Sequence, residues 1–202
     1  MKFMKQVVLV RGWEVKENYK DFYEYLENLE YLPYEFPWKR WYKSFKDLLL
    51  ENYFWIIIPM PNSDFADYKA WKIMFEKIIP YLKDDVILVG HSLGWTFLTK
   101  YFEEEKTEKL FKKVKKIILI SPASRDIPGD LIWSFEFDKN LKNLQKIQNK
   151  IIIFFSKDDF VVPFNHLEDY KKVLPNAKYR IFEDRGHFLQ EDFDELIEEI
   201  KK

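Results

Sequence analysis

A serine stands between two glycines at the point where an apolar run gives way to a helical pattern. The segment reads Gly90-His91-Ser92-Leu93-Gly94 and follows the apolar run Val86–Val89. A serine at a sharp turn between a strand and a helix projects its hydroxyl from the sheet. Glycines two residues away on each side let the strand and the helix approach closely. The pattern therefore predicts that Ser92 is a nucleophile, and the alternative is an ordinary tight turn.

A serine nucleophile needs a base, and the chain has only three histidines. His91 is fixed inside the turn by its position, and we interpret His166, at the start of a helical pattern, as a surface or capping residue. His187 follows Gly186 in a loop before the last helical pattern. We therefore expect His187 to take the serine proton.

Two adjacent aspartates follow the apolar run Ile151–Phe155, namely Asp158 and Asp159. A carboxylate at a strand end can hold a histidine in its working tautomer. We prefer Asp159, because a residue one step further from the strand can turn toward the loop that holds His187. The alternative is that Asp158 is the acid; otherwise it caps the turn. The chain order Ser92, Asp159, His187 is typical of α/β-hydrolases.

An acyl-transfer site also needs two backbone N–H groups directed at the developing oxyanion. One is expected from Leu93, the residue after the nucleophile, and the other from the loop after the first strand, where Trp13 follows Gly12. The alternative for Trp13 is a buried side chain at a strand-ending turn.

Six apolar segments predict the sheet that must position these residues. Their lack of polar alternation indicates strands buried on both faces, as in a parallel sheet. They lie at 7–10, 54–58, 86–89, 117–120, 151–155 and, more weakly, 179–182. Helical spacing at 41–49, 71–82, 97–102 and 193–200 alternates with them, which predicts a doubly wound α/β fold in one domain over residues 1–202. Residues 14–38 and 121–139 are expected to be irregular.

Composition excludes several other classes of protein. The formal net charge of −1 gives no reason to expect nucleic acid or an anionic membrane as a partner. The absence of cysteine excludes disulfides, a thiolate nucleophile and a cysteine zinc site, and three dispersed histidines do not make a metal site. No apolar stretch is long enough for a signal peptide or a membrane span, so we expect a cytoplasmic location.

These motifs together resemble the small serine hydrolases of the retinoblastoma-binding-protein-9 and YdeN type, within the α/β-hydrolase superfamily. The resemblance rests on the serine turn, Ser156-Lys157-Asp158-Asp159 before Val162-Pro163, Gly186-His187-Phe188, and Met60-Pro61-Asn62. It implies a compact α/β-hydrolase fold of about six mostly parallel strands with helices on both faces and no large lid. Arg11, where many relatives have histidine, and Trp95, where a small residue is usual and which would narrow the site, depart from the pattern.

The sequence thus predicts a serine hydrolase that cleaves carboxylic esters, or less readily amides, in a small acyl substrate, without a cofactor and as a monomer. Two alternatives remain open: a binding module that keeps the fold, and a related reaction such as acyl transfer or a lyase step. An apolar acyl pocket could draw on Trp13, Trp38, Trp41, Trp95, Trp133 and Phe160, although such aromatic residues also serve as core.

Overall fold

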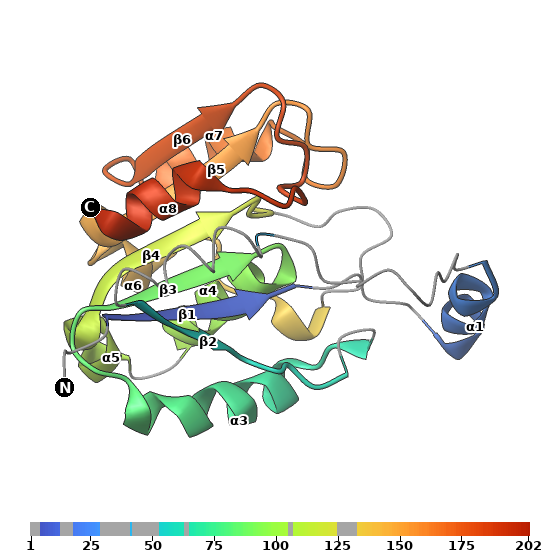
Figure 1. Ribbon diagram of the computed structural model, residues 1–202, viewed down its shortest axis with the longest axis horizontal. Helices are drawn as coiled ribbons and strands as arrows, with labels where there is room; N and C mark the ends of the chain where they lie inside the picture. Colours follow the sequence, from blue (N-terminus) through green and yellow to red (C-terminus); the bar gives the residue numbers. More distant parts are fainter. Residues whose placement is uncertain are drawn as a thin grey trace.

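The computed structural model describes residues 5–12, 18–28, 41, 53–62, 65–104, 107–124 and 133–202. Six strands form one sheet in the order β2-β1-β3-β4-β5-β6, and every neighbouring pair is parallel (Figure 1). The strands are β1 (Lys5–Arg11), β2 (Tyr53–Ile57), β3 (Val86–His91), β4 (Val114–Ile120), β5 (Ile151–Ser156) and β6 (Lys178–Phe182). All six strands predicted from the sequence are therefore confirmed.

The sheet is buried on both faces, which explains why its strands read as continuous apolar runs. In β1, Val8 and Val10 belong to one hydrophobic cluster, while Val7 and Leu9 belong to the other. Successive side chains of a strand point to opposite faces, so a strand covered on both sides needs an apolar residue at each position.

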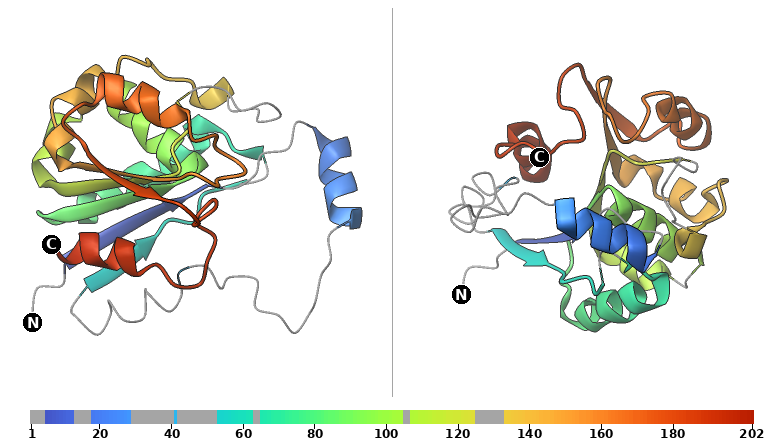
Figure 2. Two further views of the ribbon diagram at one scale, coloured as in Figure 1. Left: turned by 90° about the horizontal axis from the view of Figure 1, so that it is seen from above. Right: turned by 90° about the vertical axis from the view of Figure 1, so that its right-hand side faces the viewer.

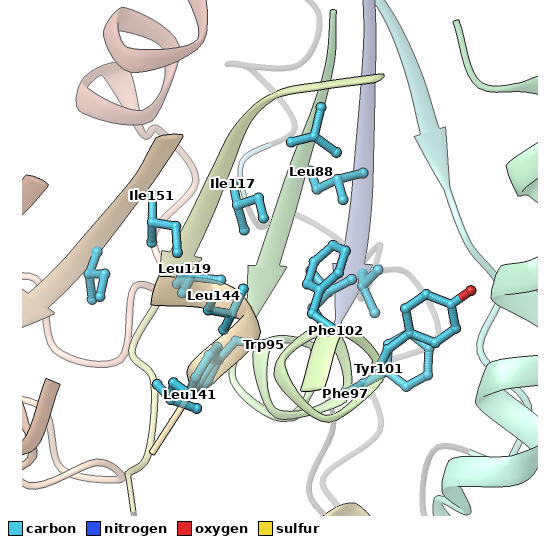
Figure 3. Close-up of a cluster of buried hydrophobic side chains, with 14 of the residues drawn as sticks. Leu88, Trp95, Phe97, Tyr101, Phe102, Ile117, Leu119, Leu141, Leu144 and Ile151 are labelled. Carbon is cyan, nitrogen blue, oxygen red and sulfur yellow. The ribbon is translucent and has the colours of Figure 1, made fainter. Parts of the chain in front are cut away.

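Helices cover the two faces of the sheet (Figure 2). The first cluster receives side chains from α3, α4, α5, α6 and α7, and the second receives side chains from α8. Figure 3 shows α4 packed on the first face, with Trp95 directed toward Leu141 and Leu144 and Phe102 directed toward the strands. Phe97 lies beside Tyr101, and its ring packs on Trp71 and Phe75 of α3. The helices are α1 (Tyr19–Asn28), α3 (Tyr68–Ile78), α4 (Leu93–Glu104), α5 (Glu108–Lys113), α6 (Lys142–Gln145), α7 (His166–Val173) and α8 (Asp194–Lys201), with 3₁₀ turns η2 (Ile79–Tyr81), η3 (Trp133–Phe135) and η4 (Gln148–Lys150).

The predicted helices over 71–82, 97–102 and 193–200 are confirmed by α3, α4 and α8, and the helical pattern at 41–49 lies outside the described residues except for Trp41. The prediction that residues 14–38 are irregular is wrong over α1. That helix is capped at its start, because Oδ1 of Asn18 accepts the main-chain N–H of Asp21 at 3.0 Å. In Figure 1, α1 stands beyond the carboxyl end of β1.

Candidate active site

The turn that carries Ser92 joins β3 directly to α4. The strand ends at His91 and the helix begins at Leu93, so Ser92 alone makes the turn, with a left-handed φ of 54°. A non-glycine residue rarely adopts this conformation, and such strain is held where the surrounding packing enforces it. Here the packing is close: a Cβ added at Gly94 would lie 2.1 Å from the carbonyl oxygen of Val10.

His187 and Asp159 meet in a buried contact. Nδ1 of His187 lies 3.0 Å from each carboxylate oxygen of Asp159, and the two side chains are 6% and 1% exposed. An ionised carboxylate only accepts hydrogen bonds, so Nδ1 carries the proton and donates it. The neutral ring therefore has its free lone pair on Nε2, the tautomer that a general base requires.

The remaining hydrogen bonds of Asp159 keep its carboxylate ionised. Oδ1 accepts the N–H groups of Val161 and Val162, each at 2.9 Å, and Oδ2 accepts the hydroxyl of Ser121 at 2.7 Å. Burial raises the pKa of Asp159, but the hydrogen bond and charge of His187, with the bonds from Ser121 and Val162, lower the pKa below its ordinary value.

Ser121 is a contributor that the sequence analysis missed. It is fully buried and follows β4 with a left-handed φ of 49°. Its place directly after an apolar strand is the signal that could have singled it out, because the carboxyl ends of parallel strands meet at one edge of the sheet.

Asp158 faces a different set of groups. Its Oδ1 accepts the hydroxyl of Ser156 at 2.5 Å and the N–H of Gly186 at 2.8 Å. These two hydrogen bonds lower the pKa of Asp158. The structure thus brings Asp159, and not Asp158, to the ring of His187, while Asp158 ties the loop before His187 to the end of β5.

The loop of His187 is held against the serine turn through His91. Nε2 of His91 donates to the main-chain carbonyl of His187 at 2.9 Å, and the two rings lie 5.0 Å apart. Ser92 is the next residue along the chain from His91. Within the described part of the chain, no hydrogen bond joins the Ser92 hydroxyl to the His187 ring. Such a nucleophile–base bond is often long without substrate.

The end of β1 packs on the predicted oxyanion donor. The N–H of Gly12 donates to the carbonyl of His91 at 2.8 Å, and a Cβ at Gly12 would lie 2.2 Å from the amide nitrogen of Leu93. The Leu93 N–H thus stands at the start of α4 beside the loop after β1. Trp13, predicted as the second donor, lies outside the described residues.

The candidate pocket aromatics separate into core and surface. Trp95 is fully buried, with its ring against Phe137 and Tyr170, so the expectation that it narrows the site is wrong. Trp41 is also buried, and its Nε1 donates to the carbonyl of Phe188 at 2.9 Å. Phe160 is exposed. Trp13, Trp38 and the side chain of Trp133 lie outside what the structure describes.

A cavity of about 440 Å³ lies against α7. It is lined by Ser124, Phe137, Lys139, Asn140, Leu141, Asp169, Tyr170, Lys172 and Val173. Because Ser92, Asp159 and His187 are not among the lining residues, this cavity does not define the size of a substrate at Ser92.

The interpretation of His166 as a surface or capping residue is wrong. It begins α7 as expected, but its side chain is buried and makes no cap to that helix. Instead, Nδ1 of His166 accepts the main-chain N–H of Ser124 at 3.0 Å. The buried ring thus satisfies a main-chain donor in the segment that follows β4.

Two further findings concern the described residues alone. None of their helices is both long and apolar enough to cross a membrane. They also contain no cluster of three or more histidine, aspartate or glutamate side chains that could hold a metal ion.

The serine hydrolase family matches residues 38–199. The chain belongs to this family. It is 29% identical over 161 residues to YdeN of Bacillus subtilis, which covers 78% of this chain and 79% of YdeN. It is 28% identical over 145 residues to the serine hydrolase RBBP9 of Rattus norvegicus, which covers 70% of this chain and 73% of that protein.

Two solved structures illustrate the fold that this chain shares. The crystal structure of the ydeN gene product from B. subtilis gives a TM-score of 0.68 at 21% identity, covering 98% of this chain and 97% of that one. An esterase from Exiguobacterium antarcticum gives a TM-score of 0.57 at 19% identity, covering 100% and 94%. The predicted family and the α/β-hydrolase fold are confirmed, and the family supports a hydrolase activity.

Proposed function

We propose that this protein hydrolyses carboxylic esters through an acyl-enzyme on Ser92, with His187 as base and Asp159 as the acid that orients it. The observation that carries the proposal is the buried contact of Asp159 with Nδ1 of His187, which leaves Nε2 free to accept a proton beside the serine turn. The family and an esterase of the same fold support it.

In the first half-reaction, Nε2 of His187 takes the hydroxyl proton while Oγ of Ser92 attacks the carbonyl carbon of the ester. The Leu93 N–H and, as the predicted second donor, the Trp13 N–H donate hydrogen bonds to the oxyanion. When the tetrahedral intermediate collapses, its bond to the alcohol oxygen breaks and His187 returns the proton to that oxygen. The alcohol then leaves. Asp159 stabilises the imidazolium ion of His187 between the two proton transfers.

In the second half-reaction, His187 takes a proton from water as the water oxygen attacks the acyl-enzyme carbonyl. The bond to Oγ of Ser92 then breaks, Oγ recovers the proton, and the carboxylic acid is released. No redox partner or cofactor enters this sequence. Amides fit the same steps, but the poorer leaving group makes esters the better substrates.

The test is labelling with a fluorophosphonate together with hydrolysis of p-nitrophenyl acetate. We expect label on Ser92 alone, and we expect Ser92→Ala or His187→Ala to lower kcat by roughly 10⁴–10⁶-fold with folding intact. The two residues act in one step, so the double variant should be little worse than either single variant.

Ser124→Ala is the matched control, because Ser124 also follows a strand beside a histidine and an aspartate. Its hydroxyl donates to Asp169 at 2.7 Å, and it is its main-chain N–H that contacts His166. The Ser124→Ala variant should react with the fluorophosphonate and hydrolyse p-nitrophenyl acetate as the wild type does. Folded wild-type protein that neither labels nor hydrolyses any ester would favour a binding module instead.

A further inference from the structure

One turn beside the candidate active site directs an apolar side chain outward. Oδ1 of Asp159 accepts the N–H groups of Val161 and Val162, which closes the turn on its inner side. Val162 is buried in the core, whereas the ring of Phe160 is 76% exposed. The turn is thus anchored on both sides of Phe160, and its ring is held at the surface.

The Phe160 ring lies next to His187. The two ring centroids are 6.4 Å apart, and a Cβ added at Gly186 would lie 3.6 Å from Cε1 of Phe160. Single exposed apolar residues are common and need no explanation by themselves. Tyr81, at the end of η2 just before β3, is equally exposed at 76%. What sets Phe160 apart is its place beside the proposed base.

The proposed chemistry decides which part of a substrate would meet this ring. The oxygen of the leaving alcohol must come within hydrogen-bond reach of Nε2 of His187 to receive its proton. The carbonyl oxygen must instead face the Leu93 N–H at the start of α4. The atoms beyond the alcohol oxygen therefore extend along the His187 side of the site, where Phe160 lies, and the acyl chain extends away from it.

We propose that Phe160 is a specificity-determining residue whose exposed ring binds an apolar leaving alcohol, so that esters of larger apolar alcohols are preferred over methyl esters. This inference rests on the proposed function. An aromatic face gains from contact with alkyl or aryl groups because both surfaces leave water. The ring carries no hydrogen-bonding group, so it discriminates by size and polarity.

The experiment compares two series of esters with the wild type, Phe160→Ala and Phe160→Leu. One series keeps the acetyl group and changes the alcohol from methyl to butyl, hexyl and benzyl. The other series consists of methyl esters and changes the acyl chain from acetyl to hexanoyl. Ratios of kcat/KM within each series remove the general reactivity of each variant.

We expect Phe160→Ala to lower the ratio of kcat/KM for hexyl acetate to kcat/KM for methyl acetate by about five- to tenfold. The ratio of kcat/KM for methyl hexanoate to kcat/KM for methyl acetate should stay unchanged within about twofold. Phe160→Leu, which keeps an apolar surface, should retain most of the preference. Tyr81→Ala, the equally exposed control, should match the wild type in both series.

The inference is overturned by any of three results for Phe160→Ala. The ratio of kcat/KM between hexyl and methyl acetate stays unchanged, kcat/KM falls equally for all esters, or the ratio between the acyl chains changes instead. Failure of the proposed function looks different, because the wild type would then hydrolyse no ester and Ser92 would take up no fluorophosphonate. A thermal melt of each variant confirms folding, which the exposure of both substituted rings favours.

Discussion

Hydrogen bonds from four residues converge on the carboxylate of Asp159: those of His187, Ser121, Val161 and Val162. A buried carboxylate without partners is costly, and each of these donors offsets part of the cost. The same donors fix the orientation of the carboxylate, so the Nδ1–H of His187 meets an acceptor whose position is already set. In this way Asp159, which would not touch a substrate, determines the tautomer of His187, the proposed base.

Exchanging the two neighbouring aspartates for asparagine should separate their roles. In Asp159→Asn, an amide NH₂ can face the Nδ1–H of His187, donor against donor, which disfavours the working tautomer. We expect kcat for p-nitrophenyl acetate to fall by up to about 10⁴-fold. In Asp158→Asn, the amide oxygen can still accept from Ser156 and Gly186, so kcat should fall far less.

Circular dichroism on both variants checks that a loss of rate is not a loss of fold. If Asp158→Asn were the inactive variant and Asp159→Asn turned over normally, the acid would be assigned to the wrong neighbour, although Ser92 and His187 would keep their proposed roles.

The contact between Asp159 and His187 could be anticipated because each residue follows its own strand, and strand ends meet at one edge. The same reasoning would have reached Ser121, which directly follows β4. The bond of His166 could not be anticipated, because it depends on a main-chain N–H 42 residues away that needs an acceptor there. The residues next to His166 in the sequence do not indicate this distant partner.

At the scale of elements, the site depends on the close approach of β1, β3 and α4. Gly12 at the end of β1 and Gly94 in the first turn of α4 both leave room for the main chain of the neighbouring element. The Leu93 N–H is therefore placed by backbone packing, and side chains at these positions would displace it.

Gly12→Ala should lower both stability and activity. The added Cβ would lie 2.2 Å from the Leu93 nitrogen and 2.8 Å from the His91 oxygen, so main chain must move. We expect a loss of about 1–3 kcal/mol in the free energy of unfolding. We also expect kcat to fall by about 10²-fold, as when one oxyanion donor is misplaced.

Gly90→Ala provides the comparison, because its Cβ would meet the Cα of Trp95 at 2.8 Å, further into α4 than the Leu93 amide. Urea unfolding should show a loss of stability for both variants, with the larger loss of kcat in Gly12→Ala. A folded Gly12→Ala enzyme with the kcat of the wild type would contradict the placement of the oxyanion donor.

The strands and the serine turn were predictable because sheet burial and the turn each impose residue types locally. The helix α1 was not predicted, although Tyr19, Phe22, Tyr23 and Leu26 follow the i, i+3, i+4, i+7 spacing of an amphipathic helix. Its local signal is Asn18 three residues before Asp21, where the amide of Asn18 also donates to the Asp21 carboxylate at 2.9 Å.

At the scale of the whole molecule, the candidate active site lies where the order of the strands in the sheet reverses. From β1 the chain continues to β2 on one side, and from β3 it continues through β4, β5 and β6 on the other. In open α/β sheets, ligands bind outside the carboxyl ends of the strands at such a reversal of the strand order. Gly12 directly follows β1 and Ser92 directly follows β3, so both lie at these two strand ends.

The opposite end of the sheet is held by a group of charges around Glu199 of α8. Its carboxylate is 1% exposed and accepts hydrogen bonds from Lys178 of β6 at 2.7 Å and from Arg180. Nζ of Lys116 in β4 donates to the main-chain carbonyl of Glu199 at 2.6 Å. These bonds join the last helix to two strands at a distance from the Ser92 turn.

This charge group should make stability depend on pH in a defined direction. Burial raises the pKa of Glu199, but hydrogen bonds from Lys178 and Arg180 and the charge of Lys178 lower it below its ordinary value. A lowered pKa in the folded state means that the carboxylate stabilises the fold above its unfolded pKa, about 4.3. The stabilisation is lost as the pH falls through the lower folded value, and Asp159, whose pKa is also lowered, acts in the same direction.

Glu199→Gln should therefore lower the free energy of unfolding at pH 7 by about 1–2 kcal/mol, a modest figure because Lys178 is half-exposed and screened by solvent. Urea unfolding at pH 7, 5, 4 and 3 should show the difference between wild type and variant shrinking below about pH 5, as the wild-type carboxylate takes up its proton. The kcat of folded variant at pH 7 should equal that of the wild type, because Glu199 lies at the other end of the sheet. A difference in stability that stayed constant down to pH 3 would mean that Glu199 acts through packing and not through its charge.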